Sequence, residues 1–325
     1  MRATKRWLKL FNRWGPIVGL VCVWVLVVLQ RTVGEASAIS YVSMSLAPAF
    51  WTGIALVGAL ILLVAKRRVL SLLYFLTAVS TIPLLWDYSN GRFREKEASD
   101  LRVMTFNVEK FRAFKPEEVA AVIRKSNPDI VCLQEVAPLA EPRLIPAAFH
   151  KALPGYRIIQ RGETAIVSKY PVAFGGVFAL RGGNGGRPAQ MVTAMVDGKP
   201  ISIICVHMQY FPWDGSLSVS EASKNFMKEV SSLEDLVREP GVPVILAGDF
   251  NTVPHGRAHR MLRKYLWDCF AETGNGFGYT LPAGFPLRRL DYIYVGLGLK
   301  PLRAWVPDRV ASDHRSVVAD LRLER

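Results

Sequence analysis

Pro243-Val244-Ile245-Leu246-Ala247-Gly248-Asp249-Phe250-Asn251 is an apolar run that ends in polar residues. Its first half is typical of a buried strand, because short continuous aliphatic runs bounded by turn residues pack inside a sheet structure. Asp249 and Asn251 then place a carboxylate and an amide where the strand should stop. Buried carboxylates are costly unless they are paired, so this ending indicates a site and not only a turn.

The same arrangement recurs elsewhere in the chain. Most of the polar residues concerned lie within or just after a run of β-branched and aliphatic residues. They are Asn107 in Thr105-Phe106-Asn107-Val108, Glu135 in Leu133-Gln134-Glu135-Val136, His207 in Val206-His207-Met208, Asp291 in Arg289-Leu290-Asp291-Tyr292, and Asp313 and His314 in Ser312-Asp313-His314. Strands that deliver carboxylate, amide and imidazole groups from their ends indicate a hydrolytic metal site.

Short apolar runs alternate with helical patterns from residue 101 onward. Helices are expected at 116–126, 218–238 and 257–267. Strands are expected at 101–108, 129–134, 156–160, 165–168, 177–180, 190–196, 201–207, 243–247, 290–295 and 316–321. Alternating strands and helices, with several strands in succession, predict an α/β (α+β) fold in which helices flank a two-sheet β-sandwich.

The polar residues also predict a chemistry. Oxygen atoms of Asp, Glu and Asn are hard ligands that suit Mg²⁺, with Mn²⁺ or Ca²⁺ as alternatives. A divalent ion polarises a phosphoryl oxygen, a carboxylate takes a proton from water, and an imidazole protonates or steadies the leaving oxygen. Together these groups supply what phosphoester hydrolysis requires.

In their order along the chain, the six motifs resemble those of the endonuclease/exonuclease/phosphatase superfamily, the deoxyribonuclease I-like fold. The resemblance covers about residues 101–322 and implies a metal-dependent hydrolase. It implies that Glu135 is the principal metal ligand, supported by Asn107 and Asp313. It also implies that Asp249 orients or deprotonates the attacking water.

The resemblance implies four further roles. Asn251 and His207 would bind the scissile phosphate or its leaving oxygen. His314 would contact the phosphate while Asp291 holds its tautomer, as carboxylates do for other functional imidazoles. Arg187 precedes a strand where the family often carries a polar side chain facing the site, so it is a further residue of interest.

Three apolar stretches without a charged residue precede this domain, at 16–29, 48–65 and 69–86. The second and third have 18 residues each, close to the ~20 needed to cross a hydrocarbon core. The first has 14 and would span only if its polar flanks take part. We expect residues 1–86 to be a membrane anchor of three transmembrane helices, 87–100 a linker and 101–325 the catalytic domain.

Positive charges predict the orientation of this anchor. Five Lys or Arg residues precede the first stretch and Lys66-Arg67-Arg68 separates the second from the third, whereas the loop after the first carries only Arg31 and Glu35. The positive-inside rule places both basic segments in the cytoplasm, so the catalytic domain is expected on the exocytoplasmic side. Alternatively, the first stretch and Ala36-Ser37-Ala38 form a cleavable signal peptide, which leaves the domain on the same side.

Most of the positive charge belongs to the apolar part. Residues 1–96 hold 12 Lys/Arg and 3 Asp/Glu, and so carry +9 of the formal net charge of +14. The basic pI is therefore weak support for nucleic-acid binding. The cysteines show no Cys-x-x-Cys spacing and predict buried free thiols rather than a disulfide framework or a zinc site.

The sequence leaves the phosphoester substrate open between nucleic acid and phospholipid. The family's abasic-site endonucleases usually have a tyrosine in place of His207, so the resemblance favours its other branches. The aromatic segment 209–215 would suit a lipid surface, a stacked base or simple packing. An inactive membrane interaction protein is the alternative of another class, and the complete motif set argues against it. The lipid bilayer is the expected partner of the N-terminal helices, and the sequence indicates no protein partner.

Overall fold

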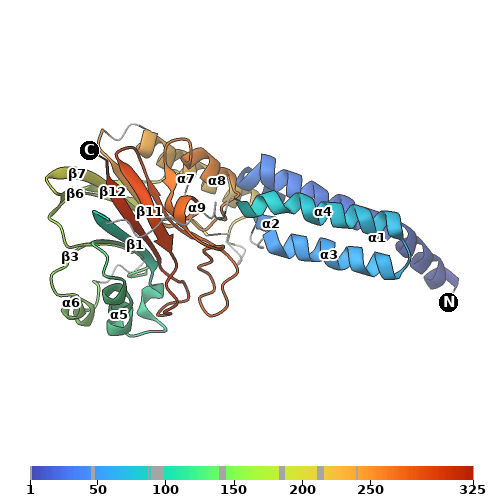
Figure 1. The fold of residues 1–325 in the computed structure, drawn as a ribbon, viewed down its shortest axis with the longest axis horizontal. Coiled ribbons are helices and arrows are strands. Elements are labelled where there is room, and N and C mark those ends of the chain that lie inside the picture. The colour runs from blue at the N-terminus through green and yellow to red at the C-terminus, as the bar shows by residue number, and fades with distance from the viewer. Residues whose placement is uncertain are drawn as a thin grey trace.

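The computed structural model describes residues 2–44, 48–86, 88, 99–138, 144–182, 187–210, 216–238 and 241–324. Long helices form a bundle that projects from one end of an α/β domain, and the N-terminus lies at the far end of the bundle (Figure 1). Most of the expected linker, the glycines 183–186 and the aromatic residues 211–215 lie outside the described residues.

The bundle contains the three apolar stretches. They lie in helices α1 (Arg2–Thr32), α3 (Pro48–Val64) and α4 (Arg68–Trp86). Within α1, Arg13–Thr32 is long and apolar enough to cross a membrane, whereas the apolar segments Phe50–Val64 and Arg68–Ile82 are shorter. The first apolar stretch, the shortest of the three in the sequence, therefore lies in the longest apolar helical segment. The reason is that its helix continues into the polar flanks.

The three helices expose apolar side chains on the outside of the bundle. Large exposed examples are Val18, Val21, Trp24, Val57, Leu60, Ile61, Val64, Leu72 and Leu76. Inside the bundle, polar groups find partners on neighbouring helices: the Tyr74 hydroxyl donates to the carbonyl of Pro16 at 2.8 Å and that of Ser71 donates to the carbonyl of Ala59 at 2.7 Å. Between α1 and α3 lie the short helices η1 (Gly34–Ala36) and α2 (Ala38–Met44).

The α/β domain contains two six-stranded sheets. Their orders are β11-β12-β1-β2-β4-β3 and β5-β6-β7-β8-β10-β9. The strands are β1 (Leu101–Asn107), β2 (Ile130–Gln134), β3 (Arg157–Arg161), β4 (Thr164–Ser168), β5 (Val172–Ala179), β6 (Pro188–Val196), β7 (Lys199–His207), β8 (Val244–Asp249), β9 (Trp267–Asp268), β10 (Asp291–Val295), β11 (Leu299–Trp305) and β12 (Val317–Leu323). This confirms the expected α/β sandwich.

Helices cover the outer faces of the sandwich. They are η2 (Glu109–Phe111), α5 (Pro116–Ser126), α6 (Ala147–Ala152), α7 (Val219–Arg238), α8 (Arg257–Leu262) and α9 (Cys269–Thr273). Aliphatic side chains from both sheets fill the central core, as Val103 and Ile203 do. Phe226 of α7 packs on the outer face of the second sheet, and Ile123 of α5 on that of the first. Helices α5 and α7 therefore each bury one apolar face against a sheet.

The helix expected at 257–267 is wrong in its second half. It ends at Leu262, and Trp267–Asp268 form strand β9 beside β10. Tertiary contacts decide this: Asp268 forms a buried ion pair with Arg289 at 2.8 Å and accepts hydrogen bonds from the first turn of α9. Strand β11 and helix α6 were not expected from the sequence.

Candidate active site

Three adjacent strands of the second sheet carry His207, Asp249 and Asp291 side by side. The parallel register pairs His207 with Asp249, and the antiparallel register pairs Asp249 with Asp291. Side chains directly opposite in a sheet lie close together. The apolar runs that precede His207 and Asp249 and follow Asp291 therefore fix the positions of these three groups.

The first sheet contributes Asn107 and Glu135 from the ends of β1 and β2. Asn107 Nδ2 donates to Asp249 Oδ2 at 3.1 Å and to Glu135 Oε1 at 3.3 Å. One amide thus links carboxylates that come from different sheets. Asn107 itself is held by the backbone N–H of Glu109, which donates to its Oδ1 at 3.1 Å.

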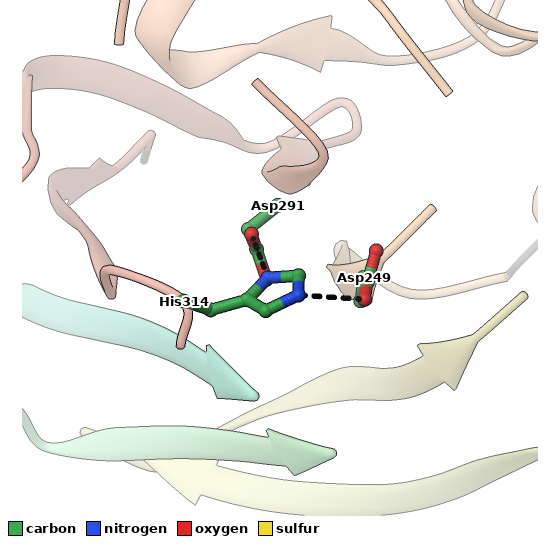
Figure 2. Close-up of side chains that lie close together, drawn as sticks. All are labelled: Asp249, Asp291 and His314. Atoms are coloured by element: carbon green, nitrogen blue, oxygen red, sulfur yellow. Dashed lines mark hydrogen bonds and ion pairs between the residues drawn. The ribbon is translucent and has the colours of Figure 1, made fainter. Parts of the chain in front are cut away.

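His314 lies between the two aspartates of the second sheet (Figure 2). Its Nδ1 is 2.8 Å from Asp291 Oδ2 and its Nε2 is 3.8 Å from Asp249 Oδ2. Burial opposes a charge on this ring, but the charges of Asp291 and Asp249 outweigh it and raise the pKa of His314 to about 10. His314 is therefore an imidazolium at neutral pH, with Nε2 turned toward Asp249.

His207 also faces a carboxylate, from a residue that the sequence analysis did not identify. Its Nδ1 lies 3.2 Å from Oε1 of the buried Glu163, in the turn between β3 and β4. Arg187 Nη1 is 2.9 Å from His207 Nε2. The interest in Arg187 was therefore justified by its place beside the site.

Asp249 lies at the centre of these groups. Its Oδ2 is 3.8 Å from His314 Nε2 and 3.9 Å from His207 Nε2, and its Oδ1 accepts the backbone N–H of Asn251 at 2.9 Å. Burial and the charge of Asp291 raise the pKa of Asp249, against the opposing charges of His314 and His207. A carboxylate with a raised pKa is a better proton acceptor than an exposed one.

Glu135 has the opposite character. Burial opposes its ionisation, but His207, Lys110 and the Asn107 amide together lower the pKa of Glu135 to about 2. Lys110, also missed in the sequence, forms an ion pair with Glu135 Oε2. Lys110 lies in a turn whose residues have left-handed backbone angles, with φ between 46° and 57° at Glu109, Lys110 and Phe111. Such conformations are uncommon for these residue types and cluster at functional sites.

The residue types of Glu135 and Asn107 suit a hard divalent cation, although the amide nitrogen of Asn107 is the atom that faces Glu135 here. An ionised carboxylate and an amide oxygen are ligands of the kind that Mg²⁺ and Mn²⁺ prefer. Ligand atoms of Asp249, Asp291 and His314 also lie within 4.8 Å of one another. In that trio, however, His314 Nδ1 is engaged by Asp291, so its geometry is that of a proton-transfer array rather than a ligand cage.

Two predicted site residues are placed differently from the rest. Asp313 is exposed, and its Oδ1 accepts a hydrogen bond from Ser312 at 3.1 Å. Of the two residues expected to support Glu135, Asn107 is the one with a hydrogen bond to it. Asn251 adopts a φ of +50°, and its Nδ2 donates to the carbonyl of Met208 at 2.9 Å. That bond ties the loop after β8 to the loop after β7.

Comparisons with known proteins bear on the α/β domain. A family model described as "Endonuclease/Exonuclease/phosphatase family" matches residues 104–314. A search of curated protein sequences finds no match.

Several solved structures are similar to the α/β domain. The endonuclease/exonuclease/phosphatase from Beutenbergia cavernae is 26% identical, with 70% of this chain and 72% of that chain covered and a TM-score of 0.57. Truncated TDP2 from Caenorhabditis elegans is 20% identical, with coverage of 68% and 97% and a TM-score of 0.56. The mannosyl-6-phosphatase from Bacteroides thetaiotaomicron is 18% identical, with coverage of 68% and 99% and a TM-score of 0.52.

Proposed function

The chain belongs to the endonuclease/exonuclease/phosphatase family, and on this premise we propose that it is a membrane-anchored, divalent-metal-dependent phosphoesterase that hydrolyses phosphodiester bonds. One observation carries the proposal. Asp249 faces two imidazoles, His314 and His207, each paired on its far side with a carboxylate. Proton acceptor, cationic donor and their orienting groups are the parts that hydrolysis of a phosphoester needs.

Asp249 is the proton acceptor in this proposal. It orients the attacking water and takes its proton, which the raised pKa of its buried carboxylate favours. His314 binds a phosphate oxygen through Nε2–H as a cation, because Asp291 engages Nδ1. His207 and Asn251 lie on the other side of Asp249, where they are proposed to hold the phosphate or its leaving oxygen. Glu135 and Asn107 would hold a divalent ion, with Asp313 proposed as a further ligand, and the ion would polarise a phosphoryl oxygen when bound.

The helical bundle is proposed to be a membrane anchor formed by residues 1–86, with 87–100 as a linker and 101–325 as the catalytic domain. Support comes from the apolar Arg13–Thr32 and from the exposed apolar side chains of α3 and α4, which pack beside α1. The turn between α3 and α4 and the N-terminus both lie at the end of the bundle away from the domain (Figure 1). Because both carry clustered basic residues, the catalytic domain is proposed to be exocytoplasmic.

Retention of the first helix is proposed over its cleavage as a signal peptide. Cleavage after Ala38 would remove Glu35, whose carboxylate is fully buried against the catalytic domain. Its Oε1 accepts a hydrogen bond from Thr252 Oγ1 at 2.5 Å. A buried carboxylate with several partners supports a segment that stays with the domain.

A substrate panel tests the proposed activity. The purified full-length chain should hydrolyse at least one of plasmid DNA, single-stranded RNA, phosphatidylinositol phosphates and sphingomyelin in Mg²⁺, and a chelator should remove that turnover. Restoring Mg²⁺ should restore it. Absence of Mg²⁺-dependent turnover across the whole panel, in a chain that is folded by circular dichroism, would contradict the proposal.

A further inference from the structure

The first connector of the bundle is fixed to the catalytic domain through Glu35. This residue of η1 is fully buried and accepts hydrogen bonds from Thr252 Oγ1 and the backbone N–H of Arg257, both at 2.5 Å, and from that of Ala258 at 3.3 Å. Gly256 makes room for the carboxylate, since a Cβ there would lie 1.9 Å from Glu35 Oε1. Thr252, which makes one of these contacts, lies three residues after Asp249 in the chain.

The second connector is fixed nearby. Tyr88, two residues beyond the end of α4, is fully buried. Its ring centroid lies 5.7 Å from that of Tyr279, 6.1 Å from that of Phe277 and 6.4 Å from that of His255. Both exits from the bundle therefore pack on the same side of the domain, and they fix how the domain is oriented on its anchor.

The loop between α9 and β10, residues 274–290, contacts both exits from the bundle. Tyr88 packs on its residues Phe277 and Tyr279. Met44, at the end of α2, packs in one cluster with Leu290, and Leu281 packs against that cluster. The same loop is bonded to the segment that carries His314: Ala283 N–H donates to the carbonyl of Asp313 at 2.7 Å. This loop thus lies between the helix ends and the catalytic centre.

Three apolar side chains of this loop are exposed. Phe285 is 73% exposed, Leu287 46% and Phe277 44%. Exposed apolar side chains also lie at the domain end of the bundle: Val28 of α1, Ile39 of α2, Phe50 of α3 and Ile82 of α4. Exposed apolar side chains that gather on a surface mark a membrane or protein contact. Because the loop packs on Met44 and Tyr88, at the domain ends of α2 and α4, the bilayer that would hold these helices is its expected occupant.

We propose that Phe277, Phe285 and Leu287 rest in the bilayer interface, and that the substrate is a phosphoester lipid of the same membrane. This inference rests on the proposed phosphoesterase activity and names its substrate class. Water adds to the lipid phosphorus, the P–O bond to the leaving alcohol breaks, and the proton lost by water ends on the alcohol oxygen. Membrane contact at the rim of the site delivers the lipid headgroup without its leaving the bilayer.

Turnover by the full-length chain in phosphatidylcholine vesicles tests this inference. The vesicles contain a minor fraction of either sphingomyelin or a phosphatidylinositol phosphate, and a soluble aryl phosphodiester and plasmid DNA are assayed in parallel with Mg²⁺. We expect the wild type to hydrolyse one of the two lipids. The double variant Phe285→Ser/Leu287→Ser should lower the ratio of lipid to soluble turnover about tenfold or more, because partial burial of one large apolar side chain already changes an equilibrium by about that factor.

Leu297→Ser is the matched control. Leu297 is 78% exposed, but it follows β10 at the end opposite Asp291, so its loss should leave the ratio unchanged. The substrate inference is overturned if DNA or the soluble diester is hydrolysed while no vesicle lipid is, phosphatidylcholine included, or if the double variant leaves the ratio unchanged. No hydrolysis of any substrate would instead overturn the proposed activity itself.

Membrane contact also has a readout that does not depend on turnover. In a Cys22→Ser background, where the three remaining cysteines are buried, a fluorophore is attached to Phe285→Cys or to Leu297→Cys. Spin-labelled lipids should quench the label at position 285 and leave the label at position 297 bright. Equal brightness at both positions would overturn the contact.

Discussion

Asp249 and His314 owe their character to neighbours rather than to residue type. Burial and the charge of Asp291 raise the pKa of Asp249, while the charges of Asp291 and Asp249 outweigh burial and raise the pKa of His314 to about 10. A proton acceptor and a cation therefore coexist near neutral pH within 3.8 Å of one another. Asp291 contributes to both shifts.

Asp291→Asn should move the alkaline limit of activity to lower pH. The pKa of His314 lies near 10, above its ordinary 6.5, so the active cation persists up to that pH in the wild type. Removing the nearest negative charge lowers this pKa, and the alkaline limb of kcat/KM against pH should shift down by about one unit or more. A limb in the same place as in the wild type would contradict the role of Asp291.

The same shift predicts how His314 contributes to stability. Because its folded pKa is raised, the stabilisation is fully present below about pH 6.5 and is lost as pH rises through about 10. The free energy of unfolding of His314→Asn, measured in urea between pH 6 and 10.5, should depend less on pH than that of the wild type. Parallel pH profiles for the two proteins would contradict the shift.

Asp249, Asp291 and His207 could be predicted from the sequence, whereas Glu163 could not. Asp249, Asp291 and His207 stand out because a polar group in a buried run has a cost that must be offset. Glu163 follows Gly162 in a turn, where an acidic residue is ordinary. Its contact with His207 depends on how the two sheets pack, because β3 and β4 belong to the first sheet and β7 to the second, and local sequence does not encode that packing.

At the scale of elements, the strands that bear the site follow from their composition. The continuous apolar runs of β7 and β8 predict central buried strands, and both lie inside the second sheet. The short elements β9 and α9 instead depend on the buried pair of Asp268 and Arg289. Such a pair joins residues 21 apart in the chain and leaves no periodic signal.

Docking of η1 on α8 should contribute measurably to stability. Glu35→Gln removes the charge that accepts hydrogen bonds from Thr252 and from the first turn of α8, and hydrogen bonds to a buried charged group contribute about 1.5–3 kcal/mol. We expect the free energy of unfolding of the full chain to fall by about that amount, and hydrogen exchange to accelerate at residues 251–258. Thr32→Ala, which removes an exposed hydroxyl bonded to Val28, is the control.

Unchanged exchange at 251–258 in Glu35→Gln would contradict this account of the docking. An equal loss of stability in Thr32→Ala would show that the effect belongs to helix α1 and not to the contact with α8.

At the scale of the whole molecule, the sequence predicts two parts but not how they meet. Hydropathy separates the bundle from the α/β domain because each has its own composition. The contacts of Glu35 and Tyr88 with the domain depend on the completed fold, in which segments about 200 residues apart come together. They fix the orientation of the α/β domain relative to the bundle.

The proposed topology predicts which surfaces a reagent outside the cell can reach. In the Cys22→Ser background, a membrane-impermeant thiol reagent should label Leu297→Cys in intact cells and should label Lys66→Cys only after lysis. The reason is that Lys66 lies in the basic turn at the end of the bundle away from the domain. Labelling of Lys66→Cys in intact cells, with Leu297→Cys protected, would reverse the topology.

The central claim is that Asp249 takes the proton of the attacking water, and one rate comparison tests it most directly. Mg²⁺-dependent phosphodiester turnover is measured for the wild type, Asp249→Asn and Asp235→Asn, the last an exposed aspartate on α7. We predict that Asp249→Asn lowers kcat about 10²–10⁴-fold, the usual contribution of a general base, with an unchanged unfolding transition and no effect of Asp235→Asn. Turnover of Asp249→Asn within a few-fold of the wild type would contradict the account.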